Sequence, residues 1–131
     1  MTQENLMIGN WIEIVPFHDK KKSYYKRIES GSDLDAVFDF QGHIRPIHIT
    51  PEILGRNGIV LDKGHYLIDI EIYVSEDRRI EISHISNMTG KDWSIHIDNK
   101  RFETIGGASV EYVHELQNIL KLCGIDKKIV L

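Results

Sequence analysis

The chain has few of the residues that cross-link a fold or anchor it in a membrane. It contains a single cysteine, Cys123, and three prolines in 131 residues. One cysteine excludes an internal disulfide and a zinc site built from several thiolates. No apolar run approaches the roughly 20 residues that a membrane-spanning helix needs, and the polar residues 1–5 lack the apolar core of a secretory leader. We therefore expect a cytoplasmic protein without a membrane partner.

Positive charge is also scarce, because 16 Lys and Arg stand against 20 Asp and Glu, for a formal net charge of −4. Nucleic-acid-binding domains usually show a basic excess or a concentrated basic face. Cations hold phosphates and tyrosines stack on bases, so the one basic concentration in the chain is our candidate binding site. The alternative is a solvated hairpin tip that protects a sheet edge. The candidate residues are Lys20, Lys21, Lys22, Tyr24, Tyr25, Lys26 and Arg27.

The sequence has the length and the hydrophobic content of one domain, which we place over residues 1–131. With 41% hydrophobic and 27% charged residues, a chain of this length buries a core without staples. Residues 1–49 read as short strands, Ala36–Phe40 and Ile44–Ile49 among them, which predicts a small barrel or rolled sheet. A short connector helix is expected over residues 50–58, with Thr50 as its N-cap and Pro51 in its first turn.

The last third of the chain predicts an antiparallel meander over residues 66–105, packed against one helix over residues 110–123. The fold class is therefore α+β. The helix has Ser109 as N-cap, Gly124 after its end, and an apolar stripe at helical spacing. That stripe contains Tyr112, Val113, Leu116, Ile119, Leu120 and Cys123. We expect Ile70, Ile82, Ile95, Leu116 and Leu120 to be buried.

The alternation of apolar and polar residues also predicts how the strands pair, since a slip of one residue turns every side chain over. The apolar faces match when Val74 lies opposite Ile80, Ile82 beside Ile95, Ile80 beside Ile97, and Phe102 opposite Ile97. On the outer face the same register places His96 between Glu81 and Glu103, and Asp98 between Arg79 and Arg101. Such alternating charges on neighbouring strands are weakly stabilising.

The helical segment Tyr112-Val113-His114-Glu115-Leu116-Gln117-Asn118 resembles the Tyr-Val-His-Gln-Leu-Gln-Asn ending of a family of uncharacterised proteins. Phages and integrated mobile elements of gut Bacteroides-type bacteria carry that family. Ile8 to Ile12, and Ile44 to Leu54 with Gly58-Ile59, are similar to two further family segments. Met7 replaces a family arginine, and Lys121 to Gly124 replace a more aromatic stretch. The resemblance implies a mobile-element origin, and it implies neither an activity nor site residues.

No arrangement of residues in the sequence indicates a reaction. The seven histidines show no metal-ligand spacing, and no P-loop, dinucleotide or nucleophile-elbow motif occurs. Gly106-Gly107 before a helix suits either an anion or a plain connector. We accordingly predict no catalytic residue, no metal ligand and no cofactor.

The sequence therefore favours a non-catalytic accessory protein of a phage or mobile element that binds a host protein or a small ligand. The alternative is a nucleotide- or nucleic-acid-binding module that uses the basic tip at residues 20–27. A metal-dependent hydrolase is a more distant alternative. The apolar end Ile129-Val130-Leu131 must dock or pair, either within the chain or between the subunits of a homo-oligomer.

Overall fold

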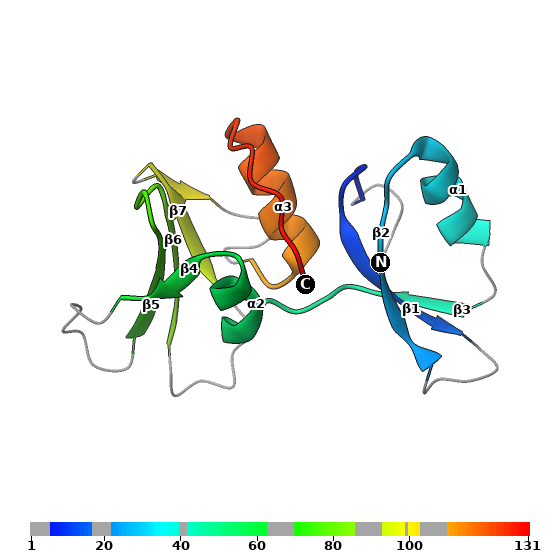
Figure 1. The fold of residues 1–131 in the computed structure, drawn as a ribbon, viewed down its shortest axis with the longest axis horizontal. Coiled ribbons are helices and arrows are strands. Elements are labelled where there is room, and N and C mark those ends of the chain that lie inside the picture. Colours follow the sequence, from blue (N-terminus) through cyan, green and yellow to red (C-terminus); the bar gives the residue numbers. More distant parts are fainter. Residues whose placement is uncertain are drawn as a thin grey trace.

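Over the residues that it describes, the computed structural model has two antiparallel sheets and three helices (Figure 1), which confirms the α+β class. Helix α3 (Val113–Leu122) lies between the two sheets, and a single extended segment links them in the chain. The described residues are 6–16, 22–39, 42–62, 70–85, 93–98, 100–102 and 110–131.

The N-terminal sheet has three strands, with β1 (Trp11–Pro16) in the centre and β2 (Tyr24–Arg27) and β3 (Gly42–Arg45) at the edges. The sheet is open, so the predicted barrel is wrong. One face of the sheet supplies a small apolar core, and helix α1 (Gly31–Asp39) contributes Leu34 to it. The buried members of this core are Leu6, Ile12, Ile14 and Ile28.

Helix α1 replaces the strand that the sequence predicts over Ala36–Phe40. Its first turn is held by local side chains, because the Ser30 hydroxyl accepts from the Asp33 amide at 3.1 Å and the Asp33 carboxylate accepts from the Glu29 amide at 3.1 Å. This reciprocal arrangement resembles a capping box and favours helix over strand. The predicted strand over Ile44–Ile49 ends early, at Arg45. Pro46 follows and has no N–H to donate to a ladder.

The connector helix α2 (Pro51–Arg56) confirms the prediction for residues 50–58. The Thr50 hydroxyl caps it by accepting from the Ile53 amide at 3.2 Å, and Ile53 and Leu54 are buried. Gly58 follows the helix at φ +74°, a conformation that L side chains avoid. Strand β4 (Ile59–Leu61) then enters the larger sheet at its edge.

The C-terminal sheet has the strand order β4-β5-β6-β7-β8, a meander. Its remaining strands are β5 (Ile70–Ser75), β6 (Ile80–Ile85), β7 (Ser94–Ile97) and β8 (Lys100–Phe102). The pairing of β6 with β7 is as predicted, with Ile82 opposite Ile95 and Ile80 opposite Ile97. All four isoleucines are buried in the main core. The predicted ends of the meander, residues 66–69 and 103–105, lie outside the described residues.

The predicted pairing of β5 with β6 is wrong by one residue, since Val74 lies opposite Glu81 and not Ile80. Ser75 fixes the turn, because its carbonyl accepts from the Arg78 amide and its hydroxyl accepts from the Ile80 amide. Turn geometry therefore decides the register, and it brings Tyr73 and Ser75 to the buried face. The prediction that Ile70 is buried is also wrong, because it lies on the opposite face and is only half-buried.

The predicted hairpin between β7 and β8 is displaced by two residues, since Lys100 lies opposite Ile97 and Phe102 opposite Ile95. Asp98 occupies the turn at φ +51°, a conformation that aspartate tolerates better than most residues. His96 therefore lies between Glu81 and Arg101, not between two glutamates. The predicted Arg79–Asp98 pair is present, with two bonds of 2.9 Å that lower the pKa of Asp98.

Helix α3 covers the buried face of the C-terminal sheet. It begins later than predicted, with Tyr112 and not Ser109 as N-cap, and the Glu115 carboxylate accepts from the Tyr112 amide at 3.0 Å. Gly124 at φ +71° ends it, and the Ile125 amide donates to the Leu120 carbonyl at 2.9 Å. The predicted stripe is buried except for Tyr112 and Cys123, which are half-buried; the buried members are Val113, Leu116, Ile119 and Leu120.

Candidate functional site

The predicted basic tip is only partly described, since Lys20 and Lys21 lie outside the described residues. Lys22 is exposed, and the other candidate residues form the edge strand β2. Tyr24 and Tyr25 are each about half exposed, at 50% and 53%. Two adjacent aromatic side chains with this exposure on an edge strand are available to a ligand.

The alternation of β2 divides the candidate residues between its two faces. Tyr24 and Lys26 lie opposite Ile14 and Ile12, on the face that holds the small N-terminal core. Tyr25 and Arg27 lie opposite Glu13 and Trp11. That second face is turned toward α3, because Trp11 packs against the main core.

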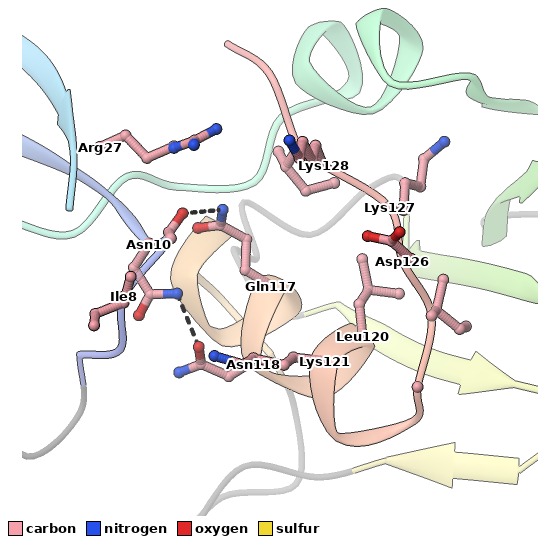
Figure 2. A pocket seen from close by; sticks show the side chains of 14 residues that line it. Ile8, Asn10, Arg27, Gln117, Asn118, Leu120, Lys121, Asp126, Lys127 and Lys128 are labelled. Carbon is pink, nitrogen blue, oxygen red and sulfur yellow. Dashed lines mark hydrogen bonds between the residues drawn. The ribbon is translucent and has the colours of Figure 1, made fainter. Parts of the chain in front are cut away.

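Among the described residues of the predicted site, Arg27 is the one that also lines a cleft, and this cleft lies between the N-terminal sheet and α3 (Figure 2). The cleft has a volume of about 540 Å³, within the range of small-molecule sites. One wall is the segment Ile8–Asn10 with Arg27, the floor is α3, and the other wall is the tail, residues 124–129. From α3 come Gln117, Asn118, Leu120 and Lys121.

Side-chain amides join the N-terminal wall of the cleft to its floor on α3. The Asn10 amide donates to Asn118 Oδ1 at 2.8 Å, and the Gln117 amide donates to the Gly9 carbonyl at 2.9 Å. Gln117 Oε1 in turn accepts from the Trp11 backbone N–H at 2.9 Å. These amides are engaged in holding the cleft together, which leaves recognition mainly to its charged side chains.

Those charges are mostly positive. Four cationic side chains line the cleft, from Arg27, Lys121, Lys127 and Lys128, together with the single carboxylate of Asp126. Figure 2 shows the Arg27 side chain reaching from β2 toward Lys128 on the opposite wall. Arg27 Nε is buried and has no hydrogen-bond partner within the described part of the chain, and the ion pair between the Arg27 guanidinium and Glu29 is long at 3.9 Å. A buried donor of this kind favours an acceptor in the cleft.

The tail wall is fixed at two points. The Trp11 indole donates to the Ile129 carbonyl at 2.8 Å. The Asn57 side chain donates to the Val130 carbonyl and accepts from the Val130 amide, both at 2.8 Å. Ile129 is buried, so the apolar end docks within its own chain, as one of the predicted alternatives has it.

A second polar cluster lies on the buried face of the C-terminal sheet. Glu71 accepts from the Tyr73 hydroxyl at 3.3 Å and lies 3.1 Å from His84 Nε2. The His84 ring stacks on Trp93 with ring centres 4.1 Å apart. Burial, and then the Glu71 carboxylate, raise the pKa of Tyr73. The cluster gives the Tyr73 hydroxyl and the Glu71 carboxylate partners at the edge of the core, whereas the buried His84 Nδ1 has none among the described residues.

His114 is a further buried polar residue, although its spacing places it outside the apolar stripe of α3. Its side chain is 6% exposed and its ring lies parallel to that of Tyr112, with centres 5.8 Å apart. Burial lowers the pKa of His114 to about 4, because a charged imidazolium is disfavoured away from water. His114 is therefore neutral at pH 7.

Two other features bear on function. No three His, Cys, Asp or Glu side chains among the described residues are grouped so that they could hold a metal ion. In the same part of the chain, none of the helices is long and apolar enough to cross a membrane.

Gly106-Gly107, the alternative anion position, lies outside the described residues. Comparisons with protein-family models, curated proteins and solved structures found no match to this chain.

Sequence reasoning identified Arg27 but missed the rest of the cleft. The cations Lys121, Lys127 and Lys128 are far from Arg27 in the sequence: Lys121 lies on α3, and Lys127 and Lys128 line the same cleft because the tail turns back along α3 (Figure 1). One signal was available: Gln117 and Asn118 are adjacent amides on the polar side of an amphipathic helix, where a contact with a second element would use them.

Proposed function

We propose that the protein is a non-catalytic binding protein whose ligand is a small anion held in the cleft between the N-terminal sheet and α3. The observation that carries this proposal is the convergence of Arg27, Lys121, Lys127 and Lys128 on one cleft in a chain of net charge −4. A cleft lined by one sign of charge focuses the field and attracts ligands of the opposite sign.

The origin of these residues supports the proposal. Arg27 comes from the N-terminal sheet, whereas the three lysines come from α3 and the tail. An anion between them neutralises positive charges that would otherwise repel one another across the contact between the N-terminal sheet and α3. Binding therefore stabilises the folded protein and the contact between its two sheets together.

The resemblance of Tyr112–Asn118 to a phage and mobile-element family supports the wider role. We propose an accessory protein of such an element, and a host-derived small anion is the partner that the cleft suits best. A host protein with an acidic segment is the corresponding macromolecular partner.

Calorimetric titration with inorganic phosphate, sulfate and tripolyphosphate tests the anion-binding proposal. We expect affinity to rise with the charge of the probe and to fall with added salt, because the contacts are mainly electrostatic. Arg27→Gln and Lys128→Gln should each weaken binding several-fold. Lys100→Gln, an exposed change on β8 outside the cleft, is the matched control and should bind normally. Absence of heat with every probe in low salt contradicts the proposal.

A nucleic-acid-binding module is the second candidate, favoured by the exposed Tyr24 and Tyr25 on the edge strand β2. Reversal of Lys20, Lys21 and Lys22 to glutamate should leave the fold intact, since charges at a hairpin tip contribute little stability. If the candidate is right, the reversal abolishes binding of a single-stranded oligonucleotide and flattens its salt dependence. No binding by the parent protein in low salt removes this candidate.

A further inference from the structure

We infer that the anion recognised by the cleft carries an aromatic base beside its phosphates: the base stacks on Tyr25, and the phosphates lie between Arg27 and Lys128. The inference rests on the proposed function, because it assigns a ligand class to the same cleft. It requires a ligand that extends out of the cleft along β2, which a nucleoside polyphosphate does.

The strand geometry places the two recognition groups at a suitable spacing. Tyr25 and Arg27 are two residues apart on β2 and therefore project from the same face. At the rise of an extended strand they are about 6.6 Å apart, which is comparable with the span of a ribose between a base and its first phosphate. The face they share is the one that looks toward α3, since Trp11 opposite Arg27 packs against the main core.

The state of each side chain fits its assigned role. Tyr25 is 53% exposed, so one side of its ring is open to a flat partner. Arg27 has the buried Nε without a partner among the described residues, and a guanidinium binds phosphate oxygens with two donors at once. Lys128 reaches the cleft from the opposite wall and points toward Arg27, where it neutralises the outer phosphates of a polyphosphate.

Tyr24 provides an internal comparison. It is adjacent to Tyr25 and equally exposed, at 50%. However, it lies opposite Ile14 and so projects from the other face of the sheet, away from the cleft. A ligand anchored at Arg27 reaches Tyr25 and does not reach Tyr24.

The experiment compares ATP with inorganic tripolyphosphate, which carries a similar charge without a base, by calorimetric titration in magnesium-free buffer. We expect ATP to bind about tenfold more tightly, the lower part of the range for one base stacked on an aromatic ring. Tyr25→Ala should lower the affinity for ATP about tenfold and leave tripolyphosphate unchanged. Arg27→Gln should weaken both probes, and Tyr24→Ala should weaken neither. Circular dichroism verifies that each variant is folded.

The outcomes separate this inference from the function on which it rests. If neither probe binds, the anion-binding function itself fails. If tripolyphosphate binds as tightly as ATP, or if Tyr25→Ala and Tyr24→Ala have equal effects, base recognition at Tyr25 is wrong although the cleft binds anions. A single-stranded oligonucleotide titrated in parallel separates the two sources of a base beside a phosphate: its binding in place of ATP overturns the assignment to a free nucleotide.

Discussion

At the scale of single residues, His114 shows how far the environment departs from the sequence pattern. Its spacing places it beside the stripe of α3, on the polar side. In the structure it is nonetheless buried, and its Nδ1 has no partner within the part of the chain that is described. A sequence pattern reports which face an element turns to its own sheet. It does not report which other faces of that element are covered by the rest of the molecule.

This burial predicts a loss of stability in mild acid. The folded-state pKa of about 4 lies below the ordinary 6.5, so between these values the unfolded chain binds the proton more readily. The stability that the neutral, buried His114 contributes to the fold is fully present above pH 6.5 and is lost as the pH falls toward 4. The loss amounts to roughly 3 kcal/mol in the free energy of unfolding. Because carboxylates also titrate in this range, the test is the difference between the parent and His114→Phe in urea unfolding. We expect the parent to lose more stability on acidification, and parallel pH profiles would contradict the burial of His114.

The core residue Leu116 gives a second prediction at this scale. It is 1% exposed and lies in the main core, so Leu116→Ala should lower the free energy of unfolding by about 2–5 kcal/mol. Leu122→Ala is the matched control in the same helix, because Leu122 is 80% exposed and should cost less than about 1 kcal/mol. Chemical denaturation of both variants measures the difference. Equal losses of stability in the two variants would show that α3 does not pack on the buried face of the C-terminal sheet.

At the scale of elements, the sequence predicts the paired faces of β6 and β7, whereas it misplaces the buried face of β5 and the ends of several elements. The facing of β6 and β7 follows from apolar alternation alone, and the Thr50 cap of α2 can be recognised from three residues. The misplaced pairings have local causes, since the Ser75 and Asp98 turns fix register through hydrogen bonds and a positive φ that alternation does not encode. The missed helix α1 has a related cause, because Ser30 and Asp33 cap a segment too short for its periodicity to stand out.

Two glycines, Gly124 after α3 and Gly55 within α2, predict opposite effects of one substitution. Gly124 ends α3 at φ +71°, where an alanine is strained, so Gly124→Ala should destabilise by about 1 kcal/mol or more. Gly55 lies within α2, and a Cβ built on it meets nothing within 4 Å. Gly55→Ala should therefore stabilise by about 0.5–1 kcal/mol. Thermal unfolding of the two variants should move the melting temperature in opposite directions. A loss of stability from Gly55→Ala would contradict the structure of α2.

At the scale of the whole molecule, the two sheets are joined by segments that are far apart in the sequence. Gly9-Asn10-Trp11 on one side and Gln117-Asn118 on the other make hydrogen bonds across more than one hundred residues. The adjacent amides Gln117 and Asn118 indicate a contact with some second element, but no local pattern identifies that element, so neither this contact nor the cleft beside it could be derived in full from the sequence.

These hydrogen bonds predict that one substitution can loosen the attachment of the N-terminal sheet to α3. Gln117→Ala removes both the acceptor of the Trp11 N–H and the donor to the Gly9 carbonyl. Leaving such backbone groups without partners costs about 1–3 kcal/mol. The cost falls on the attachment of the N-terminal sheet, while the core under α3 keeps its contacts. Hydrogen exchange should therefore quicken in β1, at Ile12 and Ile14, and remain slow in β6. Lys121→Ala, one turn further along the exposed side of α3, is the control and should leave both strands protected. Equal acceleration in β1 and β6 would show instead that both sheets open as one unit and that Gln117 stabilises the molecule without separating its halves.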